Sequence, residues 1–140
     1  MDPNINDEML RYYIALQDHF PHDWKVGDAS YDYEFGMGIV YDTGRDQGRD
    51  YVNLSFLKDK ETISYGIERP LHDLFRIPRP IDTENPERGL LGMLNDFWSL
   101  GMTINNQWAV RTGLFKASFI ADTPTLAFLK ALAHQWEVTV

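Results

Sequence analysis

The alternation of side chains over residues 31–41 constrains the fold more than any other feature of the sequence. Its odd positions are Tyr, Tyr, Phe, Met, Ile and Tyr, and its even positions from 32 to 42 are Asp32, Glu34, Gly36, Gly38, Val40 and Asp42. Successive side chains of a β-strand point to opposite faces, so a period of two predicts a half-buried strand. The pattern further predicts that Asp32 and Glu34 share its solvent face.

Two more runs with the same period follow. Residues 51–57 place Val52, Leu54 and Phe56 on one face, and residues 62–68 do the same with Ile63, Tyr65 and Ile67. Only the charged residues 58–61 separate these runs, which is typical of a hairpin. A short strand over residues 24–26 and a second hairpin, across residues 107–110 and 114–120, are also expected. Gly44 and Gly48 permit a turn between residues 41 and 51.

Three helices are predicted from capping residues and apolar periodicity. Asn6 can cap the first, which Pro21 ends. Asn85 and Pro86 begin a helix over residues 86–100, and Thr123 and Pro124 begin the last. Residues 69–86 hold four prolines and predict a surface connection with little regular structure. The fold class is therefore α+β: an antiparallel sheet of four to six strands packed by three helices, in the order α-β(3-4)-α-β-β-α. At 140 residues we expect a single globular domain over residues 1–140.

Composition excludes several classes of function. The chain has no cysteine, so a disulfide framework, a thiolate nucleophile and a cysteine-ligated zinc are ruled out. Its first residues lack the apolar segment of a signal peptide. The sequence also contains no run of about 18 apolar residues, the length that is needed to span a membrane. These features predict a cytoplasmic protein with no membrane partner.

The net charge of −8 is unevenly distributed along the chain. Residues 1–50 contain eleven acidic and four basic residues, whereas residues 51–140 contain ten and nine. Direct binding of nucleic acid is disfavoured, because neutralising phosphates requires a basic surface. A basic protein is the natural partner of an acidic surface.

The segment Asp42-Thr43-Gly44 follows an apolar run and resembles the catalytic tripeptide of retroviral-type aspartic proteases. That family has a small residue after the glycine, where this chain has Arg45, and the family's flap and later glycine element are missing. Asp42, Asp46 and Asp50 do not have the spacing of an EF-hand, which needs oxygen ligands at positions 1, 3, 5 and 12 and glycine at 6. A charged turn is the simpler interpretation.

The histidines provide the remaining candidates for chemistry. His19 and His22 could contribute to a metal site, but Pro21 separates them and the sequence indicates no third ligand. His72 and Asp73 could form an acid/base pair in a small enzyme, which we keep as an alternative. We predict no catalytic residue, no metal and no cofactor.

The strongest functional prediction is therefore a non-catalytic binding protein. The partner-binding residues that we expect are acidic side chains interleaved with tyrosines: Asp28, Tyr31, Asp32, Tyr33, Glu34, Asp42, Asp46 and Asp50. In gross character, the chain is similar to bacterial or phage inhibitors, such as immunity proteins or antitoxins that block a toxin or a nucleic-acid enzyme. Such a resemblance implies docking of an acidic face on a basic protein partner, by a monomer or a homodimer.

A second alternative is a dimeric chaperone. The element order, the length and the pI of about 4.8 are similar to those of type III secretion chaperones. That resemblance implies a homodimer that binds an extended effector segment, with the helix over residues 86–100 as the dimer element.

Overall fold

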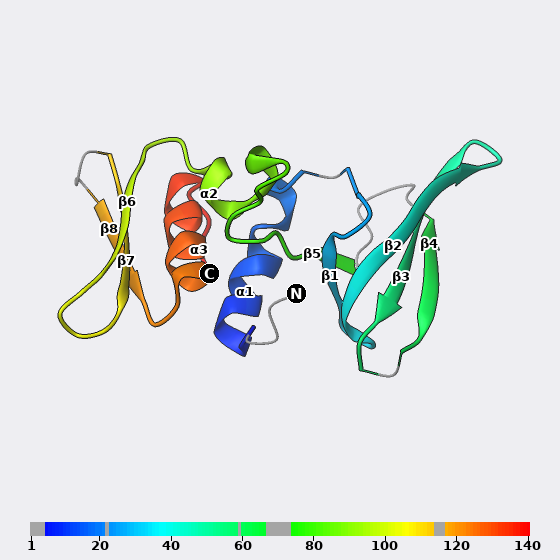
Figure 1. Ribbon diagram of the computed structural model, residues 1–140, viewed down its shortest axis with the longest axis horizontal. Coiled ribbons are helices and arrows are strands. Elements are labelled where there is room, and N and C mark those ends of the chain that lie inside the picture. Colours follow the sequence, from blue (N-terminus) through cyan, green and yellow to red (C-terminus); the bar gives the residue numbers. More distant parts are fainter. Residues whose placement is uncertain (1–4, 22, 59, 67–73, 114–116) are drawn as a thin grey trace. The chain divides into compact units, whose positions relative to one another are not determined.

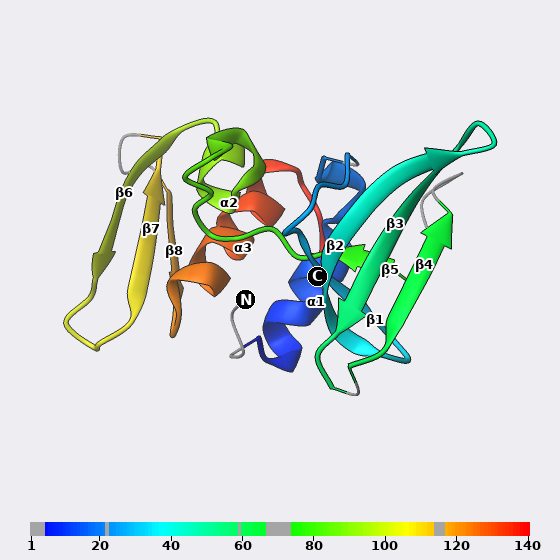
Figure 2. The ribbon, with the colours of Figure 1, turned by 45° about the vertical axis from the view of Figure 1, so that its right-hand side comes forward.

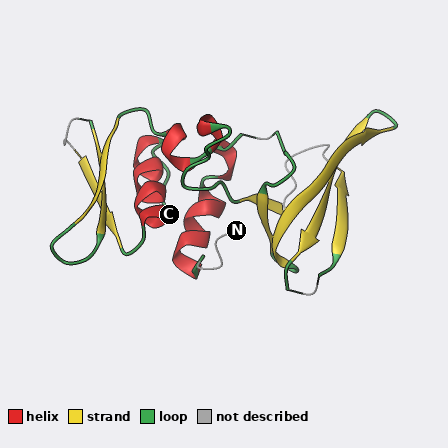
Figure 3. Ribbon diagram, in the orientation of Figure 1, coloured by secondary structure: helices red, strands yellow, loops and turns green. Residues whose placement is uncertain are grey.

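The computed structural model describes residues 5–21, 23–58, 60–66, 74–113 and 117–140. The described chain divides into two compact units, one over Pro21–Ile77 and one over residues 5–20 with Pro78–Val140. All helices of the described chain belong to the second unit, and the first is built of strands (Figure 3). The α+β fold class is confirmed, whereas the single domain stays a prediction.

The first unit is a five-stranded antiparallel sheet with the order β4-β3-β2-β1-β5 (Figure 1). Its strands are β1 (Ala29–Asp32), β2 (Gly36–Asp46), β3 (Arg49–Phe56), β4 (Thr62–Gly66) and β5 (Leu74–Arg76). The predicted inward residues of β3 form its core, since Val52, Leu54 and Phe56 are buried with Val40 and Leu74. Residues 24–26 do not form the expected strand, but Trp24 packs against this core.

The predicted strand over residues 31–41 is wrong in one respect, because the chain turns within it. Oδ1 of Asp32 accepts hydrogen bonds from the backbone N–H groups of Glu34 (2.7 Å) and Phe35 (3.0 Å). Gly36 follows with a φ of +79°, which favours glycine. An Asx turn therefore joins β1 to β2, and the alternation belongs to two antiparallel strands with Asp32 opposite Gly36.

The second unit contains a three-stranded antiparallel sheet, β6-β7-β8, and the helices. Its strands are β6 (Phe97–Met102), β7 (Trp108–Thr112) and β8 (Ala117–Ala121), and its helices are α1 (Asp7–Ala15), η1 (Gln17–His19), η2 (Pro86–Arg88), α2 (Leu90–Met93) and α3 (Pro124–Gln135). Asn6 and Thr123 cap α1 and α3 as predicted, by accepting from the N–H groups of Met9 and Leu126. Helix α3 lies against one side of the sheet (Figure 2).

The helix predicted over residues 86–100 is wrong. It is interrupted into η2 and the single turn of α2, because Gly89 (φ −84°, ψ 160°) and Leu94 (φ −77°, ψ 127°) are extended. Phe97 pairs with Thr112 in the sheet and packs on Phe128 of α3, with ring centroids 6.1 Å apart. Aromatic residues suit a pleated, half-buried surface, so tertiary contacts override the helical spacing here. Strand β5 was also not predicted, because the prolines of residues 69–86 indicated a connection with little regular structure.

In the described part of the chain, no helix combines the length and the apolar character required to cross a membrane.

Candidate functional site

The end of the β2–β3 hairpin, residues 41–51, is the candidate site and is called the hairpin arm below. Strand β1 pairs with β2 only from Gly36 to Ile39, whereas β3 pairs with β2 as far as Asp46. The arm therefore extends beyond β1, as Figure 1 shows in cyan. Nine of its residues are exposed, and Gly44 and Tyr51 are half-buried.

Local turn chemistry forms the tip of the arm. Gln47 and Gly48 have φ values of 51° and 78°. Two positive φ values in a two-residue loop define a type I′ turn, whose twist matches that of the flanking strands. The turn therefore lies at residues 47–48, and Gly44 lies inside β2 instead of in the turn.

Gly44 has a different role from Gly48. It pairs with Tyr51 across the hairpin, and a Cβ built on Gly44 would lie 2.6 Å from Cζ of Tyr51. The tyrosine ring therefore covers the glycine backbone, an arrangement that helps to fix strand register.

The aspartates of the arm lie on two faces. The register places Asp42 opposite Asn53 and Asp46 opposite Arg49 on one face, and Arg45 opposite Asp50 on the other. Asn53 donates to Asp42 at 3.3 Å, and Nε of Arg45 lies 3.7 Å from Oδ1 of Asp50. The three aspartates therefore do not form a single acidic face.

An open groove of about 620 Å³ runs along this arm. It is lined by Arg45, Asp46, Gln47, Arg49, Asp50, Tyr51, Asn53 and Ser64. Both signs of charge and several hydrogen-bonding groups meet in it, which suits a polar protein surface better than an apolar ligand.

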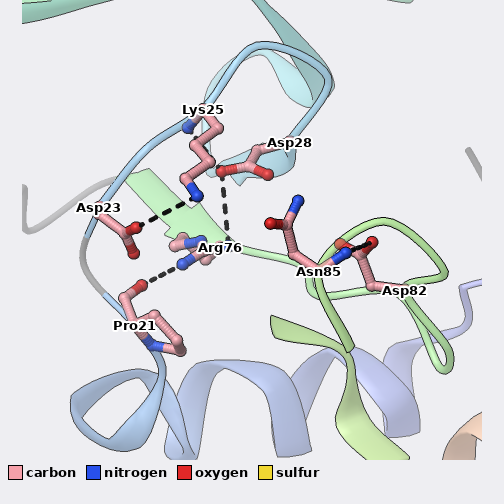
Figure 4. A network of polar contacts seen from close by, with 7 residues as sticks. All are labelled: Pro21, Asp23, Lys25, Asp28, Arg76, Asp82 and Asn85. Atoms are coloured by element: carbon pink, nitrogen blue, oxygen red, sulfur yellow. Dashed lines mark hydrogen bonds and ion pairs between the residues drawn. The ribbon is translucent and has the colours of Figure 1, made fainter. Parts of the chain in front are cut away.

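Asp28, a predicted contact residue, has a structural role. Its Oδ2 lies 3.4 Å from Nη2 of buried Arg76 and accepts from the N–H of Lys25 at 2.8 Å. Arg76 also donates to the carbonyl of Pro21, and its guanidinium carbon lies 5.6 Å from the centre of the Trp24 ring. Figure 4 shows the arginine between Pro21 and Asp28. This network holds the segment before β1 onto the sheet.

The prediction that the Asp32 carboxylate faces solvent is wrong, because this residue is only 4% exposed. Beside its two turn hydrogen bonds, Asp32 accepts one from the Tyr65 hydroxyl at 2.9 Å. The physical reason is the turn, which uses the short carboxylate as its acceptor. Reversing the charge of Asp32 would therefore disrupt the fold, and it cannot serve as a test of binding.

Tyr31, Tyr33 and Glu34 lie at the other end of β2. Tyr33 packs edge-on against Tyr31 and against Phe75, with ring centroids 6.0 and 5.1 Å apart, and it remains 61% exposed. Glu34 is exposed beside it. The full length of β2, roughly 35 Å at 3.3 Å a residue, separates this cluster from the tip of the arm. The eight predicted residues thus form two separate surfaces and two structural carboxylates.

The histidine candidates form no metal-binding group among the described residues. His19 stacks on Trp136 with ring centroids 4.8 Å apart, and His22, His72 and Asp73 lie outside the described residues. Within the described ranges, no group of three or more His, Asp or Glu side chains could hold a metal ion.

The two units share the negative charge equally. Residues 21–77 contain eleven acidic and seven basic residues, and the remainder contains ten and six, so each carries −4. The acidic residues at the N-terminal end of the sequence are thus divided between the two units.

Neither a scan against protein-family models nor a search of curated proteins finds a match to this chain.

Proposed function

We propose that this chain is a non-catalytic binding protein that docks its hairpin arm on a basic protein, as an inhibitor or immunity-type protein does. The observation that carries the proposal is the arm itself. It is a strand pair with a register shift at Tyr41 and a type I′ tip, yet almost all of its side chains are exposed. An extension that contributes so little to its own core is well suited to a contact role.

The charge of the surrounding unit supports a basic partner. Residues 21–77 carry −4, and Asp42 and Asp46 lie on one face of the arm. On the other face, Asp50 can exchange its exposed partner Arg45 for a cation of another protein at little cost, since exposed ion pairs contribute about 0–1 kcal/mol. Long-range attraction then increases the rate of association.

The two alternatives have less support. The chaperone-like alternative requires a helix over residues 86–100 as its dimer element, and those residues form η2, α2 and the start of β6. The enzyme alternative uses His72 and Asp73, of which nothing is described. A cytoplasmic location remains part of the proposal.

The test is a titration of the isotope-labelled protein with an oligo-arginine peptide, followed by backbone amide NMR shifts. We expect shifts concentrated at residues 41–51, which weaken when the salt is raised to about 0.15 M. The triple variant Asp42→Asn, Asp46→Asn, Asp50→Asn should remove them. A matched control neutralises three exposed acids of the other unit, through Glu84→Gln, Glu87→Gln and Asp96→Asn, and should leave them unchanged. Shifts that ignore the arm, or that survive its neutralisation, would contradict the proposal.

A further inference from the structure

Part of strand β2 has no neighbouring strand on one of its two edges, where the arm continues past β1 (Figure 2). Strand β1 pairs with β2 only as far as Ile39. The last contacts on that side are made by Val40, which donates to the Asp28 carbonyl (2.9 Å) and accepts from the Gly27 N–H (2.8 Å). Among the described residues, no strand pairs with residues 41–46 on this side. These residues are called the free edge of β2 below.

The register of the hairpin arm determines which backbone groups point to the free edge. In a two-residue type I′ hairpin the flanking residues, here Asp46 and Arg49, bond to each other, and bonded pairs alternate along an antiparallel ladder. Every second residue of β2 counted back from Asp46 therefore bonds to β3, and the N–H and C=O groups of Thr43 and Arg45 point to the free edge. The register shift at Tyr41 lies before these residues and leaves them regular. The free edge thus offers four backbone groups to an added strand.

Two like charges lie on one face of the free edge. Asp42 and Asp46 are exposed there, four residues apart, with half-buried Gly44 between them. In a strand added at this edge, the residues opposite the two aspartates are also four positions apart and point to the same face. The two carboxylates therefore favour a segment that has a cation at each of these positions.

The other face of the free edge sets a different requirement. Arg45 lies on it beside the uncharged Thr43, with Nε of the arginine 3.7 Å from Oδ1 of Asp50. A cation opposite Arg45 is disfavoured, because like charges directly opposite each other on neighbouring strands are destabilising. The segment that fits the free edge is therefore basic on one face and uncharged on the other.

A second copy of this chain fits the free edge poorly. In the symmetric antiparallel pairing of two free edges, Thr43 of each copy pairs with Arg45 of the other. The same register places Asp42 of each copy directly opposite Asp46 of the other, and both pairs of carboxylates repel each other. Charge therefore protects this edge against self-association, while it leaves the edge open to a basic strand.

We propose that the free edge of β2 takes an extended segment of the basic partner as an additional strand, with two Lys or Arg residues of that segment opposite Asp42 and Asp46. This strand addition rests on the proposed function of the hairpin arm and specifies how the arm recognises its partner. Backbone hydrogen bonds hold the segment, and the two carboxylates select its sequence. The opposite edge of the arm offers less, because in the described chain Asp50 is the one residue of β3 there whose backbone groups point outward.

The experiment is an NMR titration of the isotope-labelled full chain with two seven-residue peptides, each of five threonines and two arginines with blocked termini. The first peptide has its arginines at positions two and six. The second has them at positions two and five, where an extended chain points them to opposite faces. Four backbone hydrogen bonds and two exposed ion pairs support only weak binding, so the titration extends to millimolar peptide. We expect the first peptide to bind the arm about fivefold more tightly than the second.

Amide hydrogen exchange locates the added strand. When the first peptide occupies about nine-tenths of the protein, exchange of the Thr43 and Arg45 N–H groups should slow at least about fivefold, because only the free fraction exchanges readily. The matched control is the N–H of Asp50, which points to the opposite edge of the same arm and should exchange as before.

A pair of variants tests the backbone of the free edge without changing its charge. Thr43→Pro removes one outward N–H, at an edge position where proline is tolerated, and should weaken binding of the first peptide at least about fivefold. Thr43→Val keeps the N–H and should bind as the wild type does. Circular dichroism shows whether Thr43→Pro is folded, and if it is not, hydrogen exchange decides alone.

The outcomes separate strand addition from the proposed function. Peptide shifts at residues 41–51 without slower exchange at Thr43 and Arg45 overturn strand addition but leave the contact role of the arm intact. Full binding by a folded Thr43→Pro variant does the same. Equal binding of the two peptides, or no binding of either, also overturns strand addition. Oligo-arginine shifts that ignore the arm contradict the proposed function itself, and the added strand with it.

Discussion

The two sheets of this protein expose very different surfaces to water. Beyond its core, the five-stranded sheet of residues 21–77 extends an arm with Asp42, Asp46 and Arg49, all exposed. The three-stranded sheet exposes Trp98 and Ile120 around small residues, and Arg111 is the only charge in its strands. Charged side chains on a strand pair are stable in water. Exposed apolar surface instead forgoes about 25 cal/mol of stabilising free energy for every Å² that is not buried. The two sheets therefore differ in the groups that they expose, which are charged on the arm of the first sheet and partly apolar on the second.

The largest expected effect distinguishes buried from exposed charge within the five-stranded sheet. The side chain of Arg76 is 5% exposed beside Asp28, and that of Arg45 is 71% exposed beside Asp50. Arg76→Ala leaves a carboxylate without its buried cation and should lower the free energy of unfolding by about 3–5 kcal/mol. Arg45→Ala should lower it by about 0–1 kcal/mol. Urea denaturation measures both, and equal losses would contradict the structural role of Arg76.

The second effect distinguishes the two kinds of aspartate. Asp32→Ala leaves the N–H groups of Glu34 and Phe35 and the Tyr65 hydroxyl without their acceptor. An unsatisfied buried polar group costs about 1–3 kcal/mol, so we expect a loss in this range or above it. The matched variant is Asp42→Ala on the exposed arm, where we expect a change within about 0.5 kcal/mol. A stable, fully folded Asp32→Ala protein would return Asp32 to the list of contact residues.

The third effect compares one glycine of each sheet. Gly48 has a φ of +78°, and Gly101 has an ordinary φ with open space around it. Gly48→Ala should therefore destabilise the protein by about 1–2 kcal/mol. Gly101→Ala should change stability by no more than about 0.5 kcal/mol. Thermal unfolding of both variants checks this, and a neutral Gly48→Ala would argue against the type I′ tip.

The smallest expected effect concerns Asp82, which lies in neither sheet, and it measures how one carboxylate makes stability depend on pH. The pKa of Asp82 is lowered from its ordinary 3.8, chiefly by the N–H of Asn85 against partial burial, and further by the N–H of Glu84 and by Arg79 and Arg88. A lowered folded-state pKa stabilises the fold above the ordinary pKa, and this contribution disappears as the pH falls through the folded value. Asp82→Asn should therefore be less stable than wild type at neutral pH, with a difference that shrinks below about pH 4. A difference that is independent of pH would exclude the charge as its cause.

Local patterns in the sequence predicted the elements that depend on neighbouring residues. The alternation from Val52 to Phe56 is a property of one strand, and the caps Asn6 and Thr123 act on the next turn of chain. These predictions are confirmed because the interactions involved span only a few residues. The exposed aspartates of the arm were predicted for the same reason.

The contacts between segments that are distant in the sequence were not predictable from such patterns. Phe75 completes the aromatic cluster around Tyr33, but it lies in a three-residue strand that its proline-rich surroundings concealed. The three-stranded sheet combines β6, β7 and β8, and the residues of β6 have helical spacing in the sequence. The absence of acidic residues from 97 to 121 was the one signal that the sequence offered for this sheet.

The sequence by itself determined the fold class, the net charge, the absence of thiol chemistry and the presence of a turn at Gly48. Tertiary structure decided which carboxylates are buried or paired, because Asp32 is buried beside Tyr65 and Asp28 pairs with Arg76, 48 positions along the chain. It also decided that Phe97 and Trp98 belong to a strand. Side-chain periodicity records only local geometry, whereas burial and ion pairing depend on contacts between segments that the fold brings together.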